Sequence, residues 1–114
     1  MKNTITTFEW EAAKAGLFPE VVGKAIIKSG AVLEAGSLLG EHSDGTSNIA
    51  GEVDYTDINA ILIEDVDATA GDTEVDVILT GEYNQEYLKV KEDSDIKSFI
   101  KAARKNSIFI KEVY

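Results

Sequence analysis

Short runs of β-forming residues alternate with turn signals from residue 24 onward, and this rhythm constrains the fold more than any other feature. The runs KAIIK, AVL and SLLG are separated by Ser29-Gly30 and Ala35-Gly36, and Asp44-Gly45 is the next turn signal. Strands of about four to six residues joined by tight turns are typical of small barrels and sandwiches. The 114 residues, 44% of them hydrophobic, suit one domain with a modest core. We therefore predict a mainly β fold with a small helical contribution (α+β).

The run INAILIE, residues 58–64, is apolar at nearly every position. In a strand, successive side chains point to opposite faces of the sheet. One face would carry Ile61 and Ile63, and the other would carry Ile58, Ala60 and Leu62. We predict a core strand that is buried on both faces.

The run TEVDVILTG, residues 73–81, alternates between apolar and polar residues. This pattern predicts a strand with one buried and one solvated face. The buried face would carry Val75, Val77 and Leu79. The solvated face would carry Glu74, Asp76, Ile78 and Thr80.

The clearest helical segment is SDIKSFIKAARKN, residues 94–106. Its apolar residues recur at i, i+3, i+4 and i+7, namely Ile96, Phe99, Ile100 and Ala103. Ser94 or Asp95 can act as the N-cap, and Asn106 can take the left-handed conformation that ends a helix. We predict a C-terminal amphipathic helix that docks on the sheet, then a final strand over residues 108–114. A weaker helical turn is expected over residues 84–88.

Charge and composition exclude several kinds of partner. The chain has 21 acidic and 11 basic residues, a formal net charge of −10 and no cysteine. Such a charge opposes binding to nucleic acid or to an anionic membrane, so we expect neither as a partner. No apolar run approaches the roughly 18 residues of a membrane span, and the N-terminus lacks the pattern of a secretory signal. We expect a soluble protein without disulfides or thiolate metal sites.

The acidic residues of ILIEDVDATAGD raise the possibility of a calcium loop. Asp65, Asp67, Thr69 and Asp76 would fall at positions 1, 3, 5 and 12 of such a loop. A calcium loop of this type needs glycine at position 6 and a bidentate glutamate at position 12, whereas Ala70 occupies position 6 here. We interpret the segment as a strand end and a polar turn, and we expect no metal and no cofactor.

The residues that could support catalysis are few. Glu74 and Asp76 would share the solvated face of their strand, where two carboxylates have little reason to differ in pKa. His42 lies next to Ser43 and Asp44, but neighbours in sequence do not make a catalytic triad. The glycines are scattered at strand ends rather than grouped as a phosphate-binding loop. We expect no catalytic residues and no enzymatic activity.

Residues 1–22 differ from the rest and are predicted to form an N-terminal arm, with residues 23–114 as the β domain. The arm begins with the β-prone run TITTF, residues 4–8, and continues into helix formers that stop at Gly16 and Pro19. Its aromatic residues are Phe8, Trp10 and Phe18. These residues either fasten the arm to its own domain or anchor it to another protein.

One similarity does not follow from periodicity. From residue 15 the chain reads AGLFPEVVGKAIIKSGAVLEAGSLLGEHS, a DG loop, AILIEDVDATAGDTEVDVILTGEYNQEYL, a helical segment and SIFIKEVY. This succession resembles the head decoration proteins of tailed bacteriophages, the family that includes the phage lambda capsid stabilisation protein. Its most specific part is ILIEDVDATAGD followed by LTGEYN. The chain departs from the family pattern at Asn106-Ser107, where a glycine often precedes the last strand, and at Tyr83, where a small aliphatic residue is common.

The resemblance implies a compact, barrel-like domain of the β-clip type. It implies homotrimers at the three-fold and quasi-three-fold axes of the expanded capsid, on the outer surface of the virion. There they would tie subunits of the major capsid protein together against the pressure of packaged DNA. It also implies an N-terminal arm that adds a strand to the capsid protein. The candidate capsid-binding residues are Thr4, Ile5, Thr6, Thr7, Phe8 and Trp10.

An alternative from another class is a lipoyl- or biotinyl-like carrier, or another small acidic β-barrel binding module. The run SGAVLEAGSLLGEHSD imitates the spacing G-x-x-V-x-x-G-x-x-L of those barrels. A lipoyl hairpin presents a lysine in a tight acidic turn, whereas residues 64–72 contain no lysine. A metal-dependent enzyme is a second alternative, and it predicts stabilisation by calcium or magnesium.

Overall fold

The computed structural model describes residue 16 and residues 18–111. Within this part of the chain there are eight strands and three short helical segments. The strands are β1 (Val21–Ile27), β2 (Val32–Leu33), β3 (Leu38–Glu41), β4 (Thr46–Ile49), β5 (Ile58–Leu62), β6 (Val66–Asp67), β7 (Thr73–Asn84) and β8 (Ile108–Lys111). The helical segments are the 3-10 turns η2 (Gln85–Tyr87) and η3 (Ile96–Phe99) and the α-helix α2 (Ile100–Arg104). The predicted mainly β fold with a small helical part is confirmed.

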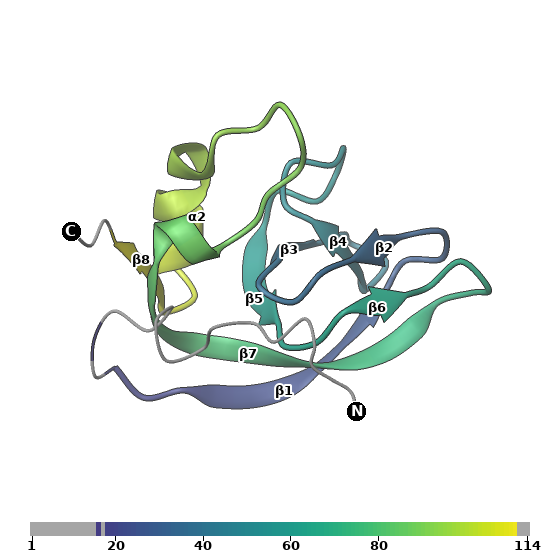
Figure 1. Cartoon of the computed structure of the whole chain (residues 1–114), viewed down its shortest axis with the longest axis horizontal. Helices are drawn as coiled ribbons and strands as arrows, with labels where there is room; N and C mark the ends of the chain where they lie inside the picture. Colours follow the sequence, from purple (N-terminus) through teal and green to yellow (C-terminus); the bar gives the residue numbers. More distant parts are fainter. Residues whose placement is uncertain (1–15, 17, 112–114) are drawn as a thin grey trace.

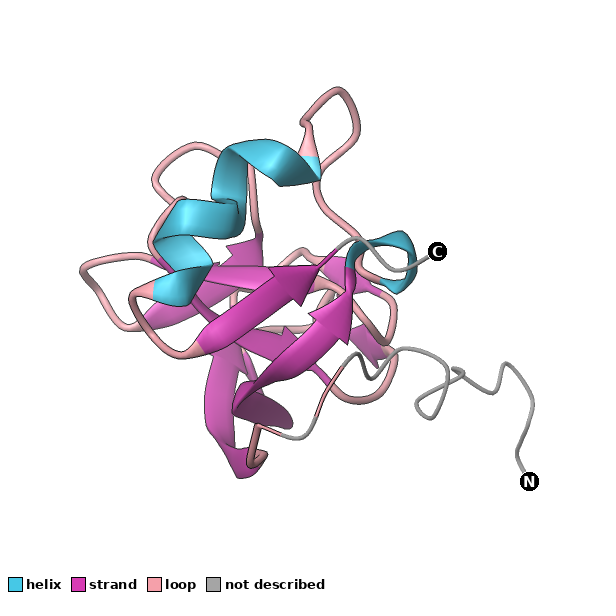
Figure 2. Ribbon diagram, turned by 90° about the vertical axis from the view of Figure 1, so that its left-hand side faces the viewer, coloured by secondary structure: helices cyan, strands magenta, loops and turns pink. Residues whose placement is uncertain are grey.

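Five strands form a closed ring in the order β1, β4, β3, β5 and β7, because β7 pairs back onto β1 (Figure 1). β1 runs antiparallel to β7 along its whole length. β8 extends the sheet by pairing in parallel with the last residues of β7. β2 and β6 form a separate small sheet. The helical segments η3 and α2 follow one another over the sheet and lead into β8 (Figure 2).

Two apolar cores lie on the two sides of β5, which confirms that this strand is buried on both faces. The first core contains Ile58 and Ile61 and is covered by side chains of η3, α2 and β8. The second contains Ala60 and Leu62, together with residues of β1, β3 and β7. The prediction that Ile58 shares a face with Ala60 and Leu62 is wrong. The register shifts opposite Leu39 and Gly40, so that the order of faces reverses at this irregularity.

The predicted alternation of β7 is confirmed over its first half. Glu74 and Asp76 are exposed, while Val77 is buried in the second core. The prediction that Ile78 faces solvent is wrong, because its side chain is only 5% exposed in the first core. The C-terminal helical segment and β8 cover that face of β7. This packing involves residues distant in sequence, so the local alternation of apolar and polar residues could not predict it.

The predicted C-terminal helix is present, but its first turn is the 3-10 segment η3 rather than α-helix. Asp95 is its N-cap and accepts a hydrogen bond of 3.0 Å from the backbone N–H of Lys97. Phe99 and Ala103 are buried in the first core, as the apolar stripe predicts. The predicted helical turn over residues 84–88 is confirmed as η2. The left-handed residue before β8 is Ser107, with φ +64°, and not Asn106 as predicted.

β1 begins at Val21, so the expected arm boundary after residue 22 falls inside a strand. Val21 and Val22 already pair with β7. Residues 18–20 approach the strand along the surface of β7 and β8. The other residues predicted for the arm, and the end of the predicted last strand after residue 111, lie outside the described residues.

Candidate functional site

The candidate capsid-binding residues at positions 4–8 and 10 lie outside the described residues, so the described part of the site is the base of the arm. Here the backbone N–H of Phe18 donates a hydrogen bond of 2.7 Å to Oε1 of Glu82 in β7. The ring of Phe18 packs edge-on against Phe109 of β8, with 4.9 Å between ring centroids. The base of the arm is thus attached to both of the last strands.

Two further contacts hold the residues just before β1. The hydroxyl of Thr80 donates a hydrogen bond of 2.8 Å to the carbonyl of Pro19. The hydroxyl of Tyr83 donates a hydrogen bond to the carboxylate of Glu20. Sequence reasoning missed these contacts because they join residues 61 and 63 positions apart. The only signal was Tyr83, a large residue where the resemblance leads one to expect a small one.

The acidic segment that suggested a calcium loop uses its carboxylates to hold neighbouring turns. Asp65 accepts a hydrogen bond of 2.8 Å from the backbone N–H of Ala35. Asp72 accepts one of 2.8 Å from the N–H of Ser29. These two bonds tie the segment after β5 to the turns on either side of β2.

Asp67 in the same segment closes a local turn. It accepts hydrogen bonds from the hydroxyl of Thr69 at 2.6 Å and from its backbone N–H at 3.0 Å. These bonds, the hydroxyl first, hold the pKa of Asp67 below its ordinary value. Within residues 16 and 18–111, no three carboxylate or histidine side chains are grouped so that they could hold a metal ion.

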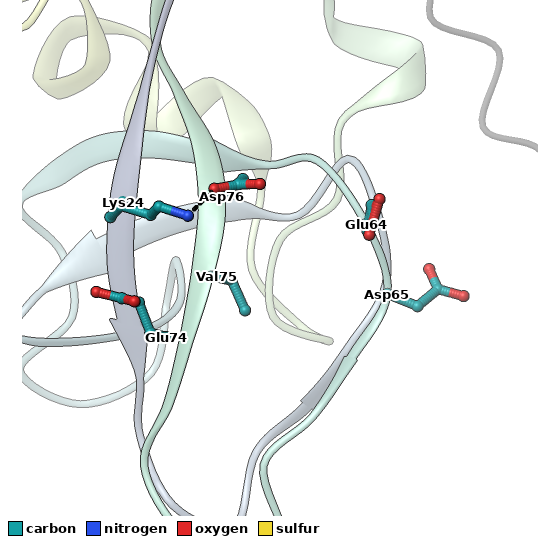
Figure 3. Close-up of a pocket in the computed structure, with 6 residues that line it drawn as sticks. All are labelled: Lys24, Glu64, Asp65, Glu74, Val75 and Asp76. Atoms are coloured by element: carbon teal, nitrogen blue, oxygen red, sulfur yellow. Dashed lines mark ion pairs between the residues drawn. The ribbon is translucent and has the colours of Figure 1, made fainter.

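A shallow depression of about 200 Å³ lies beside the acidic segment, between β1, β7 and the chain after β5. Its lining residues are Lys24, Glu64, Asp65, Glu74, Val75 and Asp76. Lys24 Nζ lies 2.5 Å from a carboxylate oxygen of Asp76, and this hydrogen bond raises the pKa of Lys24. Figure 3 shows Asp65 pointing away from this ion pair. The carboxylates therefore do not converge on one point, as acid–base catalysis would require.

His42 lies between two carboxylates at the turn after β3. Its Nδ1 lies 3.2 Å from Oδ1 of Asp44, and its Nε2 lies 3.7 Å from Oδ2 of Asp54. The backbone N–H of Thr46, followed by its hydroxyl, lowers the pKa of Asp44 to about 2. The hydroxyl of Thr46 also shares a buried hydrogen bond of 2.8 Å with Tyr55. These contacts stabilise the turn and bring no nucleophile to the histidine.

Comparison with models of known protein families and with curated proteins gives no match. Among the described residues, the helical segments are too short to cross a membrane.

Proposed function

We propose that this protein is a head decoration protein of a tailed bacteriophage. It binds the outer surface of the expanded capsid as homotrimers at the three-fold and quasi-three-fold axes. Its partner is the major capsid protein, and its domain belongs to the β-clip type. By bridging capsid subunits, it stabilises the shell against the pressure of packaged DNA.

The observation that carries this proposal is the set of hydrogen bonds that the carboxylates of the acidic motif accept. ILIEDVDATAGD is the most specific part of the resemblance, and in this fold three of its carboxylates accept hydrogen bonds from turns. Asp65 and Asp72 fix the turns around β2, and Asp67 fixes its own. A motif that specifies a scaffold suits a protein that works by shape and attachment.

A second observation supports the same assignment. The resemblance leads one to expect a glycine just before the last strand, where this chain has Asn106-Ser107. Ser107 adopts φ +64°, in the left-handed region that favours glycine. The backbone therefore follows a glycine-type path at the position where the family usually has glycine.

The arm provides the proposed mechanism of attachment. TITTF is β-prone, and an extended segment binds a sheet edge through backbone hydrogen bonds while alternate side chains set the register. Ile5 and Phe8 would be the first anchors, with Trp10 next. Three copies around one axis would combine modest contacts into strong attachment through avidity.

Quantitative mass spectrometry of purified phage particles, from the source or from its induced lysogen, tests the proposal. We expect this chain and the major capsid protein in nearly equimolar amounts. Its absence from particles, with free protein in the lysate, would contradict the proposal. The same sample tests the carrier alternative, because intact mass would then reveal an adduct on a lysine.

A further inference from the structure

Residues 18–20, which lead into β1, are exposed to solvent but make several contacts with β7 and β8. Four residues fasten them from β7 and β8, namely Thr80, Glu82, Tyr83 and Phe109. We call these four residues, with Phe18 and Glu20, the arm-base clamp. The clamp involves both the backbone and the side chains of residues 18–20.

Glu82 links three separate segments. Its carboxylate accepts the N–H of Phe18 at 2.7 Å and lies 2.5 Å from Nζ of Lys111 at the end of β8. The side chain of Glu82 is only 17% exposed, so water screens these contacts less than it would at an open surface. A side chain at Gly16 would collide with this carboxylate, so the chain passes close to it.

Tyr83 forms the second half of the clamp. Its ring is fully buried in the first core, and its hydroxyl reaches Glu20. Gly81 makes room for the ring, because a Cβ at that position would lie 2.5 Å from a ring atom of Tyr83. A residue of the first core, Tyr83, is therefore hydrogen-bonded directly to the segment that leads into β1.

We propose that the arm-base clamp holds residues 18–20 in a fixed position on β7 and β8, and that this raises the affinity of the proposed arm for its partner. A segment held at its base loses less conformational entropy on binding than a segment attached through a mobile hinge. The small aliphatic residue that is common at this position in the family has no hydroxyl and could not form this hydrogen bond. The role in affinity rests on the proposed function, whereas the clamp itself does not.

Hydrogen exchange of the Phe18 amide in the free protein tests the clamp. Tyr83→Phe removes only the hydroxyl, and Glu82→Ala removes the acceptor of the Phe18 amide. We expect exchange of this amide to be at least about tenfold faster in both variants. Tyr55→Phe and Glu74→Ala make the same chemical changes elsewhere and should leave it unchanged. Unaltered exchange in Tyr83→Phe and Glu82→Ala would overturn the clamp.

Binding to expanded capsids that lack this protein tests the positioning role. Clamp variants should need about tenfold more protein for half occupancy, while the controls match the parent. If exchange accelerates but occupancy is unchanged, the positioning role is wrong. If the parent itself does not bind capsids, the proposed function fails while the exchange result stands. Should Tyr83→Phe not fold, Glu20→Ala breaks the same hydrogen bond from the surface segment.

Discussion

The side-chain amide of Asn106 donates a hydrogen bond of 2.7 Å to the backbone carbonyl of Ile58, joining the end of the helical segment to the central strand. Because the side chain of Asn106 is hydrogen-bonded to β5, the chain turns into β8 at the next residue. Ser107 therefore carries the positive φ. This division of roles explains why the left-handed residue lies one position later than the sequence suggests.

Ser107→Gly should raise the free energy of unfolding by about 0.5–1 kcal/mol, because glycine adopts a positive φ without steric cost. Urea denaturation of parent and variant measures the change. Ser98→Gly, the same substitution within η3, should instead destabilise the protein. A Ser107→Gly variant less stable than the parent would contradict this account of the turn.

Gly40→Ala should destabilise the domain by about 3 kcal/mol or more, because its Cβ would overlap the backbone carbonyl of Tyr55. A backbone atom cannot move aside as a side chain can. Gly45→Ala is the comparison, since no atom lies near its added Cβ and only its φ of +90° is unfavourable. Its cost should be about 1 kcal/mol. Equal effects in thermal melting would show that steric overlap at Gly40 does not matter.

Ala103→Asp should prevent cooperative folding. Ala103 is fully buried in the first core, so a carboxylate there would lose its contact with water and be surrounded by apolar side chains. Ile100→Asp should also destabilise strongly, but less, because Ile100 is only partly buried. Lys101→Asp on the exposed face controls for the change of charge. Circular dichroism melting distinguishes the three, and normal melting of Ala103→Asp would mean that the helix face is assigned wrongly.

Asp44 should make stability depend on pH below about pH 4. Its pKa is lowered from 3.8 to about 2 in the fold, so the ionised carboxylate stabilises the folded state above the ordinary pKa. That contribution disappears as pH falls through about 2. Asp44→Ala should therefore be less stable than the parent at pH 6, with the difference vanishing near pH 2. A difference in urea midpoint that is the same at every pH would contradict this.

Deletion of residues 2–10 should leave a folded domain that no longer attaches to capsids. The two described cores are built from residues between 25 and 110, which the deletion leaves intact, so we expect melting close to that of the parent. Co-sedimentation with expanded capsids measures attachment. A scrambled TITTF of the same composition controls for arm length, and normal attachment of the deletion variant would refute the role of the arm.

Sequence patterns predicted the features that depend on neighbouring residues. The short strands, the two-sided burial of β5, the exposure of Glu74 and Asp76 and the apolar stripe through Phe99 and Ala103 all follow from local periodicity. The errors fall where distant segments meet. The irregularity opposite Gly40 places Ile58 on the other face of β5 from the one predicted. The C-terminal segment buries Ile78.

The candidate capsid-binding residues at positions 4–8 and 10 lie outside the described residues, so their assignment stays a prediction. Phe18 was expected either to fasten the arm to its own domain or to anchor it to another protein, and its contact with Phe109 is of the first kind. The contacts to Glu82 and Tyr83 could not be predicted, because β1 must first pair with β7 before these residues become neighbours.

The pairing of β1 with β7 also sets an order of events during synthesis. Chains grow from the N-terminus, so β1 is made early, while its partner, residues 73–84, leaves the ribosome much later. Closing this long loop costs more entropy than the shorter loops of the pairings β3–β4 and β3–β5, so we expect it to close later in folding. The arm is therefore complete on a nascent chain whose barrel is still open. Contact of Phe18 and Pro19 with β7 and β8 therefore requires that most of the chain has already been synthesised.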